Sequence, residues 1–218
     1  MLGGCVDNLT INTRLDAINY VLSCIGLAPV ESEDEYNLDV AQAAGFINNY
    51  SRRIQDNGGQ GWWFNRELNW MMSPDPVNGR IQIPNNTLAT YYVNKNGQQV
   101  RIATRGRELY DVKQYRFDMR PLADSNGYMN LTLVTQVDFD DLPYTVKNAV
   151  ATAAGAKFAT SNEMDINRIK VLAADAEVAM DEVRQENTSQ QKNNAFKDNK
   201  SMLQFDIVAG GYNNWQGV

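Results

Sequence analysis

The stretch GGQGWWFNRELNW, residues 58–70, marks the place where a helical pattern along the chain gives way to a β pattern. Its three glycines are poor helix formers, and they predict the end of a helix that begins near Asp39. Trp62, Trp63 and Trp70 follow at once. Because aromatic rings suit a pleated, half-buried surface, we expect a strand over residues 62–68, anchored to the helices through its rings.

Two amphipathic helices are predicted before this stretch. The first follows Thr13, a good N-cap residue, and ends before Gly26. The second takes Asp39 as its N-cap and repeats apolar residues at helical spacing from Val40 to Ile54. The acidic stretch between them, residues 31–35, is expected to be a solvated linker.

The middle of the chain, residues 62–137, shows the period of two that is typical of strands. Apolar and polar residues alternate around Ile83 and again over residues 131–137. Asn96-Gly97 lies between two apolar runs and predicts a hairpin with a tight turn of type I′. These patterns predict antiparallel strands.

Two more helices are predicted after the β section. The motif DFDDLP, residues 138–143, opens the third helix, with Pro143 in its first turn. An alanine-rich run to residue 160 follows, and small residues allow another helix to come close. The fourth helix is expected over residues 164–186, with a polar, loose segment after it.

The predicted fold is therefore α+β: a helical core of two N-terminal and two C-terminal helices, with an antiparallel β section inserted between them. The expected division is a helical part over 1–61, the β section over 62–137, C-terminal helices over 138–186 that pack with 1–61, and an extended tail over 187–218.

Composition excludes several classes of site. The 218 residues include no histidine, which removes the commonest general base and the commonest transition-metal ligand. Two cysteines, Cys5 and Cys24, are too few to complete a zinc site, and no glycine-rich nucleotide motif occurs. We expect no catalytic residues, no cofactor, no metal and no membrane anchor.

Charge is unevenly distributed along the chain. The net charge is −6, from 20 Lys and Arg against 26 Asp and Glu, and it argues against tight binding of nucleic acid. Residues 62–137 hold nine basic and six acidic residues, whereas the remainder holds eleven and twenty. The β section is thus basic and the helical part acidic.

One acidic cluster is a candidate for catalysis. Asp138, Asp140 and Asp141 provide paired carboxylates of the kind that a glycosidase uses. The competing interpretation is that they cap the start of the third helix, and we favour it because Pro143 follows directly.

Several residues are candidates for contacts with sister copies or other proteins. Consecutive apolar residues point to both faces of a strand, and aromatic residues in a terminal tail can anchor on a neighbouring chain. A loose basic stripe over residues 101–120 fits a solvated face or an acidic protein partner. The predicted interface residues are Trp70, Met71, Met72, Arg105, Arg107, Tyr212 and Trp215.

Three segments resemble a known family. INYVLSCIGLAPVES at residues 18–32, the glycine-terminated helix before GWWFN at residues 61–65, and DFDDLP are similar to segments of the tail tubular protein A family, adaptor or gatekeeper proteins of short-tailed, T7-like bacteriophages. The element order and GGYN at residues 210–213 also fit.

This resemblance implies a structural virion protein of the tail, assembled in the bacterial cytoplasm and without enzymatic activity. It implies a ring of twelve copies between the portal and the tail nozzle, contact with a tail fibre protein, and passage of double-stranded DNA without sequence-specific binding. Two alternatives stay open: a carbohydrate-cleaving tail component that uses the paired carboxylates, and a head-completion connector of another phage type. On charge, we expect the acidic helices to face the channel or the portal.

Overall fold

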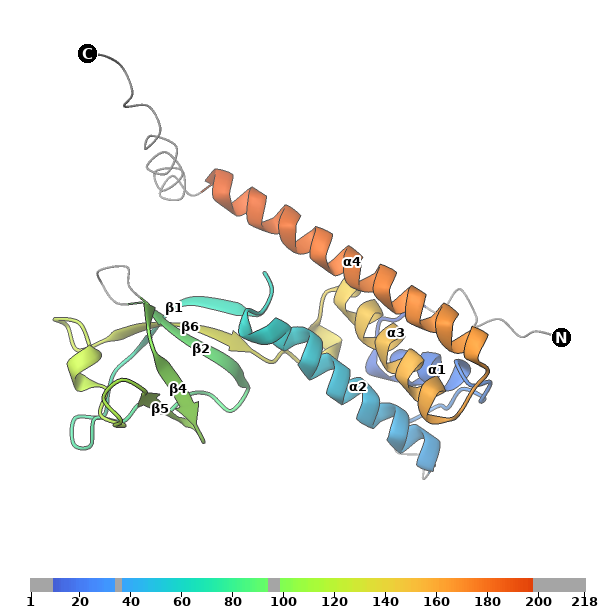
Figure 1. Ribbon diagram of the computed structural model, residues 1–218, viewed down its shortest axis with the longest axis horizontal. Coiled ribbons are helices and arrows are strands. Elements are labelled where there is room, and N and C mark those ends of the chain that lie inside the picture. The colour runs from blue at the N-terminus through green and yellow to red at the C-terminus, as the bar shows by residue number, and fades with distance from the viewer. Residues whose placement is uncertain (1–9, 34–36, 94–98, 198–218) are drawn as a thin grey trace, which may run out of the picture.

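The computed structural model describes residues 10–33, 37–93 and 99–197 of the chain (Figure 1). Helices and antiparallel strands occupy separate parts of the molecule, so the predicted α+β class is confirmed. The elements follow in the order α1 (Arg14–Ser23), α2 (Leu38–Asp56), η1 (Asn57–Gly59), β1 (Arg66–Met72), β2 (Thr87–Val93), β3 (Gln99–Val100), β4 (Ile102–Arg105), β5 (Glu108–Asp111), η2 (Arg120–Leu122), β6 (Met129–Thr135), η3 (Phe139–Asp141), α3 (Tyr144–Ser161) and α4 (Ile166–Lys197).

The four α-helices form one body, which we call the helical body. A capping box starts α1: the Thr13 hydroxyl accepts from the Asp16 amide at 3.2 Å, and the Asp16 carboxylate accepts from the Thr13 amide at 2.8 Å. α3 lies at the centre and packs against the other three helices. Helices from both ends of the sequence therefore share one hydrophobic core.

Small residues set the spacing of these helices. A Cβ atom added to Gly155 of α3 would lie 2.8 Å from Cys24 Sγ and 3.2 Å from Tyr20 Cε1. The alanine-rich run of α3 is buried in the same core. The absence of larger side chains is what allows α1 to approach α3 so closely.

The second helix begins two residues earlier than predicted. Asn37 is its N-cap, and the Asn37 side-chain oxygen accepts from the Asp39 amide at 2.9 Å. Asp39, the expected cap, lies in the first turn, where its charge suits the positive end of the helix. The helix ends at Asn57, which adopts a left-handed conformation with φ of 46°.

The strand predicted over residues 62–68 begins only at Arg66, and the preceding residues form a turn. Trp62 is 5% exposed, and its indole N–H donates to the Ile54 carbonyl at 2.6 Å. Asn65 fixes the turn by accepting from the Trp62 amide at 2.7 Å and donating to the Gln55 carbonyl at 2.9 Å. A turn held by the hydrogen bonds of Asn65, rather than a strand, therefore joins Trp62 to the sheet.

The strands form a main sheet in the order β1-β6-β2-β3 and a separate β4-β5 hairpin. We call residues 66–135 the β part. β1, which leaves the helical body, pairs with β6, which returns to it. β2 and β3 pair as the hairpin prediction requires, while the Asn96-Gly97 turn itself lies outside the described residues. The β part has its own core, with Ile81, Leu109, Met119, Leu131 and Leu133 fully buried.

The segment that leads from β6 back to α3 differs in detail from the prediction. Pro143 stands at the N-cap position of α3 rather than inside its first turn, and a short 3-10 helix precedes it. Asp140 was expected at the positive end of α3. Its carboxylate instead accepts from the Arg14 amide at 2.7 Å, which places it at the first turn of α1, 126 residues away in sequence.

The fourth helix is longer than predicted. α4 has 32 residues, a length of about 48 Å, and continues to Lys197 where an extended tail was expected from residue 187. Leu172, Ala179 and Val183 are buried towards the helical body. In Figure 1, α4 runs along the upper edge and extends past α3 above the β part. The division of the chain at residues 61, 137 and 186 stays a prediction.

Candidate interaction surfaces

The first candidate surface is the outer strand of the main sheet, and we call it the edge surface. Trp70 is 42% exposed and Met71 62% exposed, while Met72 is partly buried against the core of the β part. Leu68 on the same strand is also exposed. β1 pairs on one side only, with β6, so its other side offers unpaired backbone groups in the described structure.

β1 contains an irregularity just before Trp70 and Met71. Glu67 pairs with Leu133 and Trp70 with Leu131, so the strand carries one extra residue between these pairs. Asn69, inside the bulge, has a φ of 57°. Trp70 and Met71 lie after the bulge and pair regularly with Leu131 and Asn130, so they point to opposite faces, and both faces of this edge strand are exposed over residues 66–71.

The structure places Arg105 and Arg107 at the turn of the β4–β5 hairpin, in the other sheet. Both are exposed, and the Arg105 guanidinium lies 3.5 Å from the centroid of the Tyr110 ring, a cation–π contact. They are thus separate from the edge surface. Tyr212 and Trp215, the last two predicted interface residues, lie outside the described residues.

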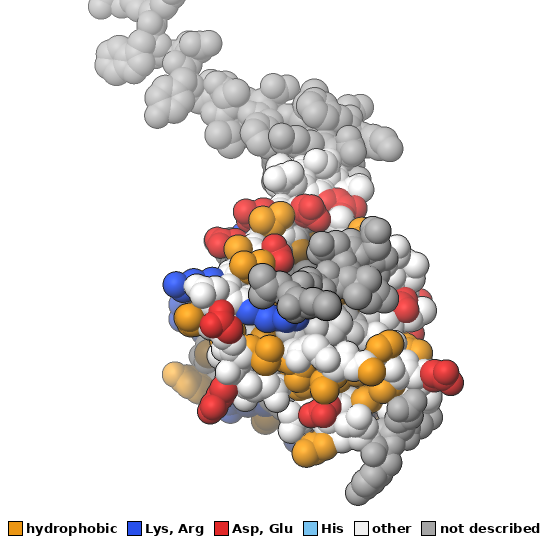
Figure 2. All heavy atoms as spheres, turned by 90° about the vertical axis from the view of Figure 1, so that its right-hand side faces the viewer, with side chains coloured by type: hydrophobic (Ala, Val, Ile, Leu, Met, Phe, Trp, Pro, Cys, Tyr) orange, Lys and Arg blue, Asp and Glu red, His pale blue; other side chains and the backbone are white. Residues whose placement is uncertain are grey.

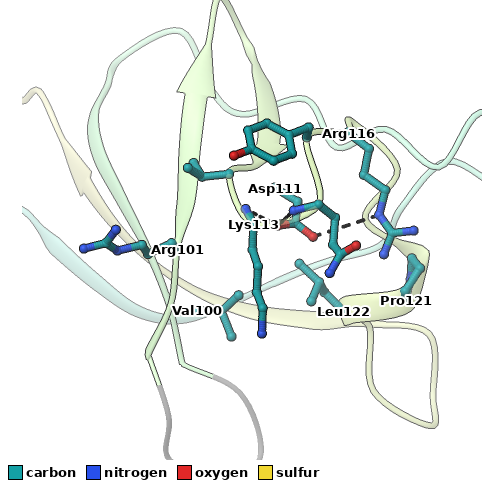
Figure 3. A pocket seen from close by; sticks show the side chains of 10 residues that line it. Val100, Arg101, Asp111, Lys113, Arg116, Pro121 and Leu122 are labelled. Carbon is teal, nitrogen blue, oxygen red and sulfur yellow. Dashed lines mark hydrogen bonds and ion pairs between the residues drawn. The ribbon is translucent and has the colours of Figure 1, made fainter.

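A second candidate surface is a cavity of about 740 Å³ beside β5, which we call the basic pocket (Figure 3). Arg101, Lys113 and Arg116 surround it, with Val100 and Leu122 among its apolar lining residues. In Figure 3, Arg101 and Arg116 stand on either side of Lys113. Sequence reasoning included these cations in a loose stripe but could not show that three of them share a cavity.

A buried carboxylate shapes the loop of the basic pocket. Asp111 is 1% exposed, and its Oδ1 accepts from the Lys113 amide at 2.9 Å and the Gln114 amide at 3.0 Å. Arg116 Nε lies 4.0 Å from Asp111 Oδ2 and, in the described structure, has no hydrogen-bond acceptor. Tyr115 is 80% exposed with a φ of 56°, a conformation that non-glycine residues rarely adopt.

A second ion pair of the β part, between Arg120 and Asp118, has shorter contacts than the pair between Arg116 and Asp111. The Arg120 guanidinium donates to Asp118 Oδ1 at 2.9 Å and to Oδ2 at 2.8 Å. These hydrogen bonds from Arg120 lower the pKa of the Asp118 carboxyl to about 2. An added Cβ at Gly79, whose φ is 72°, would collide with the Asp118 carboxylate, so the ion pair needs a glycine beside it.

A third candidate surface lies on an exposed flank of α4. Val171, Asp175, Val178 and Glu182 are all exposed, and their spacing of i, i+4, i+7 and i+11 puts them on one face. We call this face the outer stripe. Sequence reasoning singled out the buried face of the helix and missed this second one, although the repeat of valines at i and i+7 marks it.

The acidic cluster after β6 has a structural use. All three carboxylates are exposed, and Asp140 binds the Arg14 amide as described above. Lys147 adds to this junction, because its ammonium donates to the Asp140 carbonyl at 2.7 Å and to the Asn12 carbonyl at 2.8 Å. Within the described residues, no group of three or more Cys, Asp or Glu side chains is arranged to hold a metal ion.

Acidic residues also mark the outside of the helical body. Figure 2 views the molecule from the helical end, and Asp and Glu side chains are scattered over this face while Lys and Arg gather towards its left side. None of the helices in the described part of the chain combines the length and hydropathy that a membrane crossing needs.

Comparison with known proteins assigns these features to a family. No protein with a curated description matches the chain. A family model described as tail tubular protein matches residues 15–205, which spans the helical body and the β part. This match confirms the resemblance seen in the sequence, and the chain belongs to the tail tubular protein family of phage tail structural components.

Proposed function

We propose that this protein is a tail adaptor that forms a ring of twelve copies between the portal and the tail nozzle. The observation that carries the proposal is α4, which has about 48 Å of helix with one face buried against α3 and another exposed over residues 166–190. In a compact monomer, a helix that extends so far and stays exposed on one face would add little to the stability of the fold. A ring subunit uses it to reach its neighbours.

The charge division supports a role in DNA passage. Acidic side chains such as Glu177 and Asp181 are exposed on α4, whereas the β part carries the basic pocket and two exposed arginines at the β4–β5 turn. DNA sticks to surfaces that replace its counterions with Lys and Arg. We therefore place the helical body at the channel or the portal, and the β part outward, towards nozzle and fibre proteins.

The edge surface and the chain end complete the proposed contacts. Trp70, Met71 and Met72 offer apolar area beside an unpaired strand edge, a combination that neighbouring proteins use for docking. Tyr212 and Trp215 are proposed to anchor on a sister copy or a tail protein. Arg105 and Arg107 are proposed to meet an acidic partner.

We propose no catalytic role for the acidic cluster. Its central carboxylate, Asp140, is already bonded to the backbone of α1, and that contact supports capping over turnover. The prediction about Asp140→Asn in the Discussion tests this point directly.

The test of the adaptor proposal is the mass of the assembled protein. The purified chain is measured by native mass spectrometry and sedimentation, alone and mixed with the portal protein of the same virus. We expect a complex that contains twelve copies on the portal, seen as a ring by electron microscopy. A chain that stays monomeric in the presence of the portal contradicts the proposal.

A further inference from the structure

Two surfaces of opposite charge belong to different parts of the molecule. The outer stripe belongs to α4, along the upper edge in Figure 1, and the basic pocket lies beside β5, at the lower edge. A closed ring built from one kind of chain needs two different surfaces on every copy, one that fits the other surface of the next copy. The outer stripe is acidic and the basic pocket is cationic, so the two differ and are complementary in charge.

The basic pocket contains cationic side chains that are available to a partner. Among the described residues, Arg101 and Lys113 make no ion pair, and Arg116 Nε is buried without a hydrogen-bond acceptor. Its single carboxylate, Asp111, is occupied by two backbone amides. The pocket therefore offers two unpaired cationic side chains, Arg101 and Lys113, to acidic groups that enter it, beside Arg116, which is paired with Asp111 at 4.0 Å.

The lining and rim of the basic pocket are partly apolar. Val100, Val112 and Leu122 line it, and the exposed Tyr115 belongs to the same loop. A cavity of about 740 Å³ admits the ends of several side chains, whereas a whole helix is about 10–12 Å across. The fitting partner is a surface from which carboxylates project between small apolar side chains.

The outer stripe presents this pattern. Val171 is 60% exposed and Val178 is 61% exposed, and Asp175 and Glu182 lie between and after them on the same face. Within the described part of the chain, neither carboxylate is in an ion pair, in contrast to Asp181, which binds Arg184. Apolar and acidic groups thus alternate along one side of a rigid helix.

We propose that the basic pocket of one copy binds the outer stripe of the neighbouring copy, so that this contact closes the ring. The inference rests on the proposed ring function and names the surfaces that build it. Carboxylates of Asp175 and Glu182 pair with Arg101 and Lys113, and the valines cover the apolar rim around Tyr115. Electrostatic complementarity of this kind fixes which surface meets which and in what register.

The test reverses charge on each surface and then on both. In the full-length chain, Arg101→Glu/Lys113→Glu changes the pocket, and Asp175→Lys/Glu182→Lys changes the stripe. A matched control, Arg52→Glu/Lys157→Glu, makes the same charge change at two exposed positions of the helical body. Circular dichroism establishes that each variant is folded, and sedimentation with and without the portal measures assembly.

We expect each double variant to need roughly tenfold more protein, or more, for half-assembly, since opposed like charges replace attractive pairs. The quadruple variant, with both surfaces reversed, should assemble like the wild type, and the control should not differ from it. These results support the contact between copies.

Three outcomes overturn the inference. Pocket variants that form rings normally show that the pocket lies outside the contact, and the adaptor proposal then still stands. A quadruple variant that assembles no better than the doubles shows that the two surfaces do not meet. Pocket variants that form rings but lose the portal, or lose DNA, assign the pocket to that partner. A wild-type chain that never assembles with the portal refutes the adaptor function itself.

Discussion

The helical body and the β part obey different packing rules. In the helical body, small residues bring helices together, and its core draws on residues from both ends of the sequence. The β part has a smaller core of its own, and consecutive apolar residues on its outer strand stay exposed. We infer that the helical body supplies most of the stability, and we propose that the β part supplies surface for partners.

The largest effect is expected where the two regions join. Trp62→Ala removes a buried ring and leaves the Ile54 carbonyl without its donor, so unfolding should become easier by about 3–5 kcal/mol. Chemical denaturation measures this loss. Trp70→Ala, on the exposed edge surface, is the control and should cost far less. Equal losses in both variants would contradict the assignment of Trp62 as the anchor.

The next test concerns the close approach of α1 and α3. Gly155→Leu forces a side chain against Cys24 and Tyr20 and should destabilise the fold by about 1–3 kcal/mol. Gly45→Leu is the matched control, because an added Cβ there meets nothing within 4 Å, and it should stabilise α2 by about 0.8 kcal/mol through helix propensity. Shifts of the same sign in thermal melts would show that spacing does not limit α1.

A smaller effect is expected at the N-terminus of α1. Asp140→Asn weakens the charged cap on the Arg14 amide and should cost about 1 kcal/mol, whereas Asp141→Asn, for which no side-chain hydrogen bond is seen in the described structure, should cost less. Melting temperatures compare the two. If the chain cleaves a polysaccharide and either variant abolishes that turnover, the acidic cluster is catalytic and the structural interpretation fails.

On the edge surface, a substitution should reduce binding to partners more than it reduces stability. Met71→Ser should change the free energy of unfolding by no more than about 0.5 kcal/mol, because the side chain is mostly exposed. It should reduce binding to the portal or to tail proteins, measured by cosedimentation. A clear loss of stability with unchanged binding would move Met71 from the partner surface to the fold.

The smallest effect follows from the low pKa of Asp118. Because the folded pKa is about 2 and the ordinary value is 3.8, the ion pair with Arg120 contributes stability above about pH 4 and loses it as the pH falls towards 2. Asp118→Asn should therefore melt slightly below the wild type at pH 7 and match it near pH 2. A constant difference across this range would assign the effect to packing.

Periodicity in the sequence was sufficient for the main elements and their order. The capping box at Thr13, the buried faces of α1 and α2, and the alternation around Leu131 and Leu133 are local patterns, and local patterns are what a sequence displays. The α+β class follows from them.

Local patterns of this kind do not predict contacts between residues that are far apart in the sequence. Asp140 stands beside α3 in sequence but caps α1, and three cations spread over residues 101–116 meet in one cavity. The polar composition after Glu186 predicts a loose segment, but α4 continues to Lys197, and none of these residues is a proline or glycine that would end it. The predicted interface residues at 212 and 215 lie outside the described structure.

The pairing of β1 with β6 has one more consequence. The chain departs from its helical body and comes back through adjacent strands, held side by side by Asn65, whose amide donates to the Thr135 carbonyl at 3.0 Å. Both connections between the helical body and the β part therefore run side by side, next to a contact between β2 and η1. The β part can therefore change in length or sequence while the four helices keep their mutual packing, because its core is separate from theirs.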